Sequence, residues 1–131
     1  MVQHSTKQLS ILLVEDDYVS QLIMKQMSKL KGWKLQVASN GKEALDIYAK
    51  NDFDLILMDI QMPEMNGFEV TRTIREMENS IHRYTPIIAT TAYAMSEDKE
   101  KCLKVGMDDY LSKPIDLKKL CETIRNLTSQ K

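Results

Sequence analysis

The sequence predicts an α/β fold, (βα)5, in which five strands form one doubly wound parallel sheet with helices on both faces. The main observation is that short apolar runs and amphipathic stretches alternate five times along the chain. The first, third and fourth runs are apolar on both faces, as are strands buried between two layers of helices. The length of 131 residues corresponds to about one domain, and 43% hydrophobic and 28% charged residues are typical of a globular protein.

The five expected strands are short, and each is bounded by charged residues, glycine or proline. They span residues 11–14, 35–38, 55–58, 87–90 and 110–112. Parallel strands in this order require right-handed crossovers through the intervening helices.

Apolar residues recur at three- and four-residue spacing between these runs, which indicates amphipathic helices. The apolar stripe of the first helix consists of Val19, Leu22, Ile23, Met27 and Leu30. Gly32 ends this helix, the second helix covers residues 44–49, and the third follows Gly67. The fourth runs from about Ser96 to Gly106, and the fifth begins near Asp116. We expect a frayed tail at residues 1–8, a single domain over 9–131, and the longest loop at 78–85.

Charge and composition exclude several classes of protein. A formal net charge of −1 argues against broad binding to nucleic acid or to an anionic membrane surface. No apolar run approaches the roughly 18 residues of a membrane span, and the polar start does not resemble a signal peptide. Two cysteines, Cys102 and Cys121, fit a reducing compartment. The sequence therefore predicts a cytoplasmic protein without membrane insertion.

Polar and charged residues follow four of the five expected strands. Glu15, Asp16 and Asp17 follow the first strand, Asp59 ends the third, Thr90 and Thr91 end the fourth, and Lys113 and Pro114 follow the fifth. Ligands bind such sheets at the carboxyl ends of the strands, so these groups should share one crevice. Clustered carboxylates repel by about 1–4 kcal/mol per pair at 4 Å, which a lysine or a hard cation such as Mg²⁺ offsets. A carboxylate beside Mg²⁺, a hydroxyl and a lysine is suited to accept a phosphoryl group.

Four motifs resemble those of the response-regulator receiver domains of two-component signalling. They are I-L-L-V-E-D-D (11–17), M-D-I-Q-M-P-E-M-N-G (58–67), A-T-T-A (89–92) and D-D-Y-L-S-K-P-I (108–115). The resemblance extends from about residue 10 to residue 127. The last motif resembles receivers of hybrid sensor kinases more than those of DNA-binding regulators, and the sequence is equally compatible with a stand-alone relay protein and with part of a larger protein. The resemblance implies a flavodoxin-like strand order of 2-1-3-4-5, an Mg²⁺ cofactor, and a histidine kinase or histidine phosphotransfer domain as partner. It also implies a monomeric signalling domain rather than a turnover enzyme, with no output domain in this chain.

The resemblance assigns the acceptor and metal site residue by residue. Asp59 corresponds to the phosphoacceptor, and Asp16 to the direct Mg²⁺ ligand. Asp59 and the backbone carbonyl of Gln61 would complete the protein ligands, with Glu15 in a supporting position. Asp17 would lie outside the ligand set.

The remaining roles are also implied by the resemblance. Thr91, which precedes Ala92, corresponds to the switch hydroxyl, and Thr90 is then the last residue of the strand. Lys113 corresponds to the phosphate-binding lysine, followed by a cis bond to Pro114. Tyr110 corresponds to the aromatic residue whose ring turns inward when the threonine moves. Gln61 and Tyr93 occupy the two positions that control access of water to the phosphoryl group.

Several alternatives compete with these assignments. A phosphatase with an aspartate nucleophile would need a second Asp where Gln61 stands, and a flavin-binding protein would not place three acidic residues in its phosphate loop. A degenerate docking module would not keep the complete set of site residues. Tyr110 could instead be fixed in one rotamer, with the partner reading the phosphate directly. Met62 and Met65 are either core residues or partner contacts.

Overall fold

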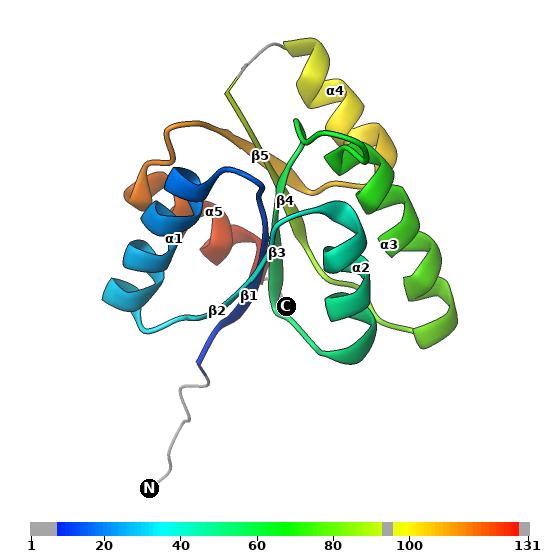
Figure 1. The fold of residues 1–131 in the computed structure, drawn as a ribbon, viewed down its shortest axis with the longest axis horizontal. Coiled ribbons are helices and arrows are strands. Elements are labelled where there is room, and N and C mark those ends of the chain that lie inside the picture. The colour runs from blue at the N-terminus through cyan, green and yellow to red at the C-terminus, as the bar shows by residue number, and fades with distance from the viewer. Residues whose placement is uncertain (1–7, 93–95, 129–131) are drawn as a thin grey trace, which may run out of the picture.

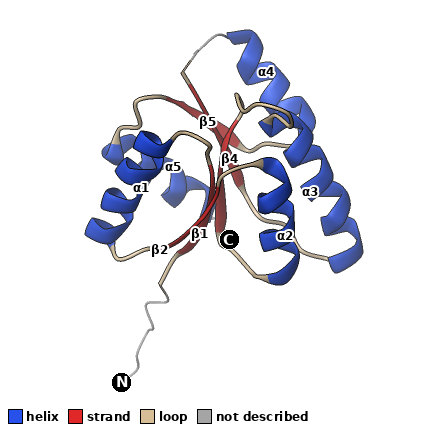
Figure 2. Cartoon of the chain, viewed as in Figure 1, coloured by secondary structure: helices blue, strands red, loops and turns tan. Residues whose placement is uncertain are grey.

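The computed structural model describes residues 8–92 and 96–128, which form one five-stranded parallel sheet flanked by helices (Figure 2). The strands are β1 (Ser10–Val14), β2 (Lys34–Ala38), β3 (Leu55–Asp59), β4 (Ile87–Thr91) and β5 (Asp109–Ser112). The helices are α1 (Tyr18–Lys31), α2 (Gly41–Lys50), α3 (Gly67–Ile81), α4 (Ser96–Val105) and α5 (Leu117–Thr128). The strand order is β2-β1-β3-β4-β5, so the predicted fold class and order are confirmed.

The sheet lies between two layers of helices. Helices α1 and α5 cover one face, and α2, α3 and α4 cover the other (Figure 1). Alternate residues of β1, β3 and β4 point into two separate hydrophobic cores, one on each face. Val14, Met58 and Ala89 belong to the core under α2–α4, whereas Leu13 and Leu57 belong to the core under α1 and α5. Burial on both faces explains why these strands read as continuous apolar runs.

Side-chain caps define where the helices begin. Asp17 caps α1 by accepting a hydrogen bond from the Ser20 N–H at 2.9 Å, and Asn40 caps α2 in the same way. Asn66 forms a capping box with Glu69 at the start of α3. Gly32 ends α1 in the left-handed conformation with φ of 75°, as the sequence predicted.

The predicted loop at residues 78–85 is too long, because α3 continues to Ile81. Glu78 lies on the buried side of this last turn, where its carboxylate accepts hydrogen bonds from the Tyr48 hydroxyl (2.6 Å) and the Thr85 N–H (2.9 Å). These bonds give a charged residue a buried position, which the sequence pattern does not reveal.

Arg75 on α3 connects the segments that lead into β4 and β5. Its guanidinium donates to the carbonyl oxygens of Thr85 and Gly106 and to the carboxylates of Glu78 and Asp108, at distances of 2.7 to 3.0 Å. Asp108 also accepts a hydrogen bond from the N–H of Ile87, the first residue of β4. This network ties the amino ends of both strands to α3.

Most of the apolar stripe predicted for α1 does not face the core, although Met27 of that stripe packs against the core under α1 and α5. Val19 is 60% exposed and Leu30 is 77% exposed, and Leu22 and Ile23 are also exposed. The buried face of α1 instead consists of Gln21, Met24 and Ser28. The prediction was wrong because the polar residue Gln21 lies on the buried face. Its side-chain amide donates hydrogen bonds to the carbonyl of Glu15 (2.6 Å) and to the hydroxyl of Ser39 (3.2 Å), which offset the cost of burying it.

The ends of the chain lie mostly outside the described residues. Of the predicted tail at residues 1–8, Gln8 is described, and its side chain donates a hydrogen bond to the Gly32 carbonyl at 3.0 Å. Within residues 8–92 and 96–128, no helix has the length and apolar character needed to cross a membrane.

Candidate phosphoacceptor and metal site

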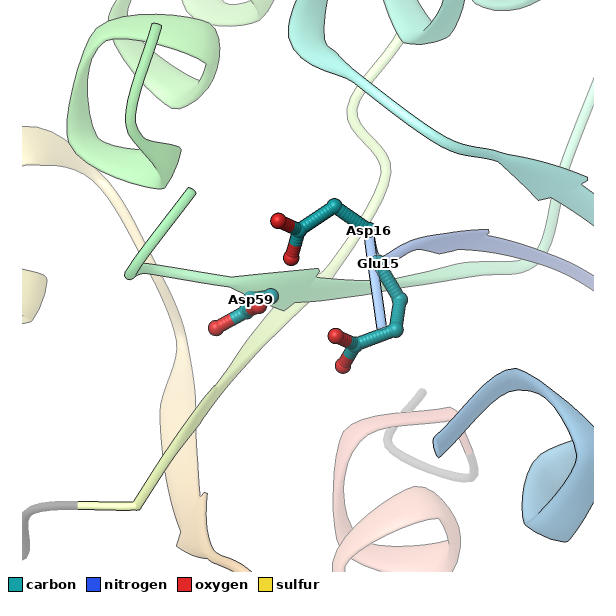
Figure 3. Close-up of side chains that lie close together, drawn as sticks. All are labelled: Glu15, Asp16 and Asp59. Carbon is teal, nitrogen blue, oxygen red and sulfur yellow. The ribbon is translucent and has the colours of Figure 1, made fainter. Parts of the chain in front are cut away.

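Three carboxylates converge at the carboxyl edge of the sheet (Figure 3). Glu15 and Asp16 directly follow β1, and Asp59 is the last residue of the neighbouring strand β3. One oxygen from each carboxylate lies within 4.8 Å of the others. Glu15 and Asp59 are buried, whereas Asp16 is exposed. Hard oxygen ligands, one of them open to water, suit Mg²⁺, which keeps part of its hydration shell in proteins.

Lys113 brings the positive charge to this cluster. Its Nζ lies 2.7 Å from Glu15 Oε1 and 3.6 Å from Asp59 Oδ2. The backbone N–H of Lys113 donates to the Thr91 carbonyl at 2.7 Å, which fixes the segment after β5 against the end of β4. The bond between Lys113 and Pro114 is cis, as predicted.

Burial perturbs the charge states of these groups. The pKa of Asp59 is raised from 3.8 to about 7, mainly by burial and also by the charge of Glu15. This is the net value, because the hydrogen bond from the Gln61 N–H and the charge of Lys113 act in the opposite direction. Burial also lowers the pKa of Lys113, but the hydrogen bond to Glu15 and the charge of Asp59 outweigh this effect, so the net shift is upward. Lys113 therefore stays protonated at neutral pH, whereas Asp59 is held near its titration point.

The backbone around Asp59 and Asp17 is held by local hydrogen bonds. The Gln61 N–H donates to Asp59 Oδ1 at 3.0 Å, so the loop after β3 turns back over the Asp59 carboxyl. The Asp17 N–H donates to Glu15 Oε2 at 3.0 Å, while the Asp17 side chain points to the first turn of α1 as its cap. The Ser20 N–H lowers the pKa of Asp17 through this hydrogen bond. Asp17 is outside the cluster of three carboxylates, as expected.

The residues predicted to act as a switch lie on two adjacent strands. Thr91 is the buried last residue of β4, next to the strand that carries Asp59. Tyr110 is half-buried on β5 and packs against the core under α2–α4. Tyr93 lies outside the described residues.

The sequence analysis noted Gly67 as the end of the 58–67 motif and the start of a helix, but gave it no role at the site, which it shapes. A Cβ at this position would lie 2.5 Å from the carbonyl oxygen of Asp59 and 2.8 Å from the Cα of Ile60. The first residue of α3 therefore packs directly against the backbone of Asp59 and Ile60. Of the two methionines in this loop, Met62 is buried in the core, and Met65 is half-buried against it. The placement of Met62 excludes it as a surface contact in this structure.

Gln21 is a second residue whose role the sequence analysis missed. Its amide holds the carbonyl of Glu15, and so positions the segment from which Glu15 and Asp16 project. The available signal was a polar residue one position away from an apolar stripe beside an acidic loop. That pattern is equally typical of an exposed glutamine.

This arrangement places a nucleophilic carboxylate, a cation site and an ammonium group within a few ångströms of one another. Residues 11–125 match the sequence profile of the response regulator receiver domain. The chain belongs to this family. As a receiver domain, it is a signalling domain of two-component and phosphorelay systems rather than a typical turnover enzyme.

The sequence of this receiver domain is similar to part of a hybrid histidine kinase. It is 48% identical over 120 residues to hybrid signal transduction histidine kinase B of Dictyostelium discoideum, covering 85% of this chain and 6% of the kinase. The chain thus spans a small fraction of that relative.

Two of the solved structures with the same fold are informative about the site and its partners. The receiver domain of the sensor histidine kinase PA1611 of Pseudomonas aeruginosa, which has a magnesium ion in its active site cleft, is 37% identical. Its TM-score is 0.81, with 92% of this chain and 97% of that chain covered. The Saccharomyces cerevisiae receiver domain of Ssk1, co-crystallised with the histidine phosphotransfer protein Ypd1, matches at 32% identity and a TM-score of 0.84. That match covers 92% of this chain and 89% of that chain.

Proposed function

We propose that this receiver domain accepts a phosphoryl group from a phosphohistidine onto Asp59. The observation that carries the proposal is the convergence of Asp59, Glu15 and Asp16 beside the ammonium of Lys113. An Asp59 carboxylate oxygen attacks phosphorus as the bond from phosphorus to the imidazole nitrogen breaks, and the released imidazole takes up a proton. The product is an aspartyl phosphate and a neutral histidine on the donor.

The metal ligands in this proposal are Asp16, Asp59 and the backbone carbonyl of Gln61, with Glu15 in support. Mg²⁺, when bound, supplies positive charge that neutralises the phosphoryl oxygens. Glu15 already pairs with Lys113 at 2.7 Å, so it holds the lysine over the site rather than acting as a primary ligand. Lys113 then stabilises the transferred phosphoryl group, and the segment ending at Pro114 positions its ammonium.

Intact-mass measurement with acetyl phosphate and Mg²⁺ tests the acceptor. Wild type should gain one phosphoryl group, and Asp59→Asn should gain none. Asp17→Asn is the matched control, because asparagine also caps a helix and the variant should still be labelled. Equal labelling of wild type and Asp59→Asn would refute the assignment, and loss of labelling in Asp17→Asn would shift the metal site by one residue.

The exposed apolar residues of α1 support docking of a histidine kinase or histidine phosphotransfer domain beside Asp59. Val19, Leu22 and Ile23 are exposed on the helix that directly follows the acidic loop. Exposed apolar patches of this kind mark protein interaction sites. The co-crystal of the Ssk1 receiver with Ypd1 makes a phosphotransfer protein a suitable candidate partner.

A charge-introducing variant separates docking from chemistry. Leu22→Glu should slow phosphotransfer from a phosphorylated histidine phosphotransfer protein at least tenfold, while labelling by acetyl phosphate stays unchanged. The control is Leu103→Glu, because Leu103 is also exposed but lies on α4 on the other face of the sheet. Equal slowing by both variants would contradict docking through α1.

We further propose that Thr91 and Tyr110 couple phosphorylation to the surface around α4 and β5. The phosphoryl group adds about −1.5 to −2 charge at pH 7, which attracts a hydroxyl and vacates space for the ring. Thr91→Ala should still bind a beryllofluoride phosphate mimic but lose the amide NMR shifts around Tyr110. Persistence of those shifts would favour a partner that reads the phosphate directly.

The other predictions of the sequence complete the proposal. Gln61 and Tyr93 tune the lifetime of the aspartyl phosphate, so Tyr93→Ala should accelerate its hydrolysis. Residues 9–131 form one receiver domain that acts as a monomer. The cytoplasmic location expected from the sequence stays a prediction.

A further inference from the structure

Helix α1 differs from the other helices in its charge. Its 14 residues include Lys25, Lys29 and Lys31 and no acidic residue. Each of the other helices that the structure describes carries acidic residues, and α2 and α4 carry equal numbers of acidic and basic residues. Because the whole chain has a formal net charge of −1, the positive charge of α1 is a local feature of the molecule.

The three lysines of α1 are exposed, and their charges are not balanced within the protein. In residues 8–92 and 96–128, none of them forms an ion pair with another residue. Lys29 and Lys31 lie in the last turn of the helix, where positive charge interacts favourably with the helix dipole. The dipole does not account for Lys25, which lies in the middle of the helix.

These lysines continue the exposed apolar face of α1. One stripe of the helix, with successive spacings of four, three and four residues, consists of Tyr18, Leu22, Lys25 and Lys29. Tyr18 and Leu22 are exposed and lie toward the acidic loop, from which α1 starts. At a rise of about 1.5 Å per residue, Lys29 lies about 10 Å beyond Leu22 along the helix axis. The stripe therefore changes from apolar to basic with distance from the phosphoacceptor.

The amino end of the same helix is negatively charged. Asp16 and Asp17 directly precede α1, and both are exposed. An anionic membrane surface laid along α1 would meet these carboxylates as well as the lysines. A protein can instead present acidic side chains to the lysines alone, and the unequal ends of the helix then fix the direction in which it lies. The charge pattern therefore favours a protein partner with a localised acidic patch.

We propose that the basic end of α1, formed by Lys25, Lys29 and Lys31, binds an acidic patch on the histidine phosphotransfer domain that donates the phosphoryl group. This inference rests on the proposed function and adds the charge and position of the partner's contact surface. The patch lies on the side of the apolar contact that is away from the phosphohistidine. Attraction between opposite charges steers the encounter and turns the phosphohistidine toward Asp59.

Charge reversal on α1 tests this inference, with phosphorylated Ypd1, the phosphotransfer protein of the Ssk1 co-crystal, as the donor. At an ionic strength of about 0.01 M, Lys25→Glu/Lys29→Glu should accept the phosphoryl group about tenfold or more slower than wild type. The difference should shrink to about twofold in about 0.5 M salt, where charges are screened within a few ångströms. Lys42→Glu/Lys50→Glu is the matched control, because it makes the same charge change at exposed positions of α2, on the other face of the sheet (Figure 1). Its rate should equal that of wild type.

Labelling by acetyl phosphate separates failure of this inference from failure of the proposed function. Both double variants should be labelled like wild type, which shows that they fold and keep the acceptor site. Absence of labelling in wild type would refute the proposed function. If labelling and the effect of Leu22→Glu persist while reversal of the lysines has no effect at low ionic strength, only this inference is wrong.

The remaining outcomes also decide the inference. Equal slowing by the α2 control, a loss that does not depend on salt, or no transfer from Ypd1 to wild type that is labelled normally would each overturn it. Vesicles of phosphatidylserine and phosphatidylcholine test the membrane alternative. Binding of wild type to these vesicles that is lost in Lys25→Glu/Lys29→Glu, with unchanged phosphotransfer, would assign the lysines to a membrane surface and overturn the inference.

Discussion

Asp59→Asn should make the metal-free protein more stable at pH 8. Asp59 is 3% exposed, and burial raises its pKa from 3.8 to about 7, so folding favours the neutral carboxyl. At about 1.4 kcal/mol per pKa unit, the difference between the folded and unfolded pKa of Asp59 sets an upper limit of about 4 kcal/mol on the cost of the ionised form. Asparagine removes that cost but also loses the attraction of Lys113 at 3.6 Å. We therefore expect a net gain in the free energy of unfolding of about 1–3 kcal/mol.

The pH dependence distinguishes this mechanism from a general packing effect. Because the folded pKa of Asp59 lies above its unfolded value, the cost is absent below pH 3.8 and fully present above about pH 7. The advantage of Asp59→Asn should therefore stay nearly constant from pH 8 to pH 7 and shrink steadily between pH 7 and pH 5. Urea denaturation in the presence of a chelator measures it, with Asp46→Asn on the exposed side of α2 as the control. A variant less stable than wild type at pH 8, or an advantage that grows as the pH falls, would refute the reasoning.

Three further predictions concern the metal, the backbone and the Arg75 network. Magnesium should bind to wild type with an affinity that rises up to tenfold per pH unit below about pH 7 and then levels off, because binding needs the ionised Asp59; calorimetry over this range checks it. Gly67→Ala should lower the free energy of unfolding by about 1–3 kcal/mol, because the new Cβ would overlap the Asp59 carbonyl. Urea denaturation measures this change, and an unchanged free energy of unfolding would contradict the prediction. Arg75→Met should cost about 3–5 kcal/mol because two carboxylates lose their partner, whereas the exposed control Arg72→Met should change stability little in the same assay.

The sheet and most of the site were predictable because each depends on a local pattern. β1, β3 and β4 are buried on both faces, so their apolar runs stand out whatever the neighbouring helices do. The carboxyl ends of parallel strands meet at one edge, so naming the residues after each run was enough to bring Asp16, Asp59 and Lys113 together.

The orientation of α1 was not predictable in this way. The spacing of apolar residues identifies a helix. It identifies the buried face only where apolar residues, and not hydrogen-bonded polar ones, pack against the sheet. In α1, Gln21 is buried by two hydrogen bonds to residues outside the helix, and the apolar residues Val19 and Leu22 remain exposed. The error is informative, because this exposed apolar face of α1 is the surface that we propose for docking of the phosphoryl donor.

The two ends of the sheet differ in how their charges are satisfied. At the amino ends of β4 and β5, Arg75 pairs with both Glu78 and Asp108, and these carboxylates also accept hydrogen bonds from the N–H groups of Thr85 and Ile87. At the carboxyl edge, Lys113 pairs with Glu15 and Asp59, the carboxylate of Asp16 lies beside them, and burial together with the charge of Glu15 leaves Asp59 with a raised pKa. A bound cation relieves this excess of negative charge, and so the site gains affinity for metal from the repulsion that folding creates. The network around Arg75 lies at the opposite edge of the sheet, so it stabilises the fold away from this cluster of carboxylates.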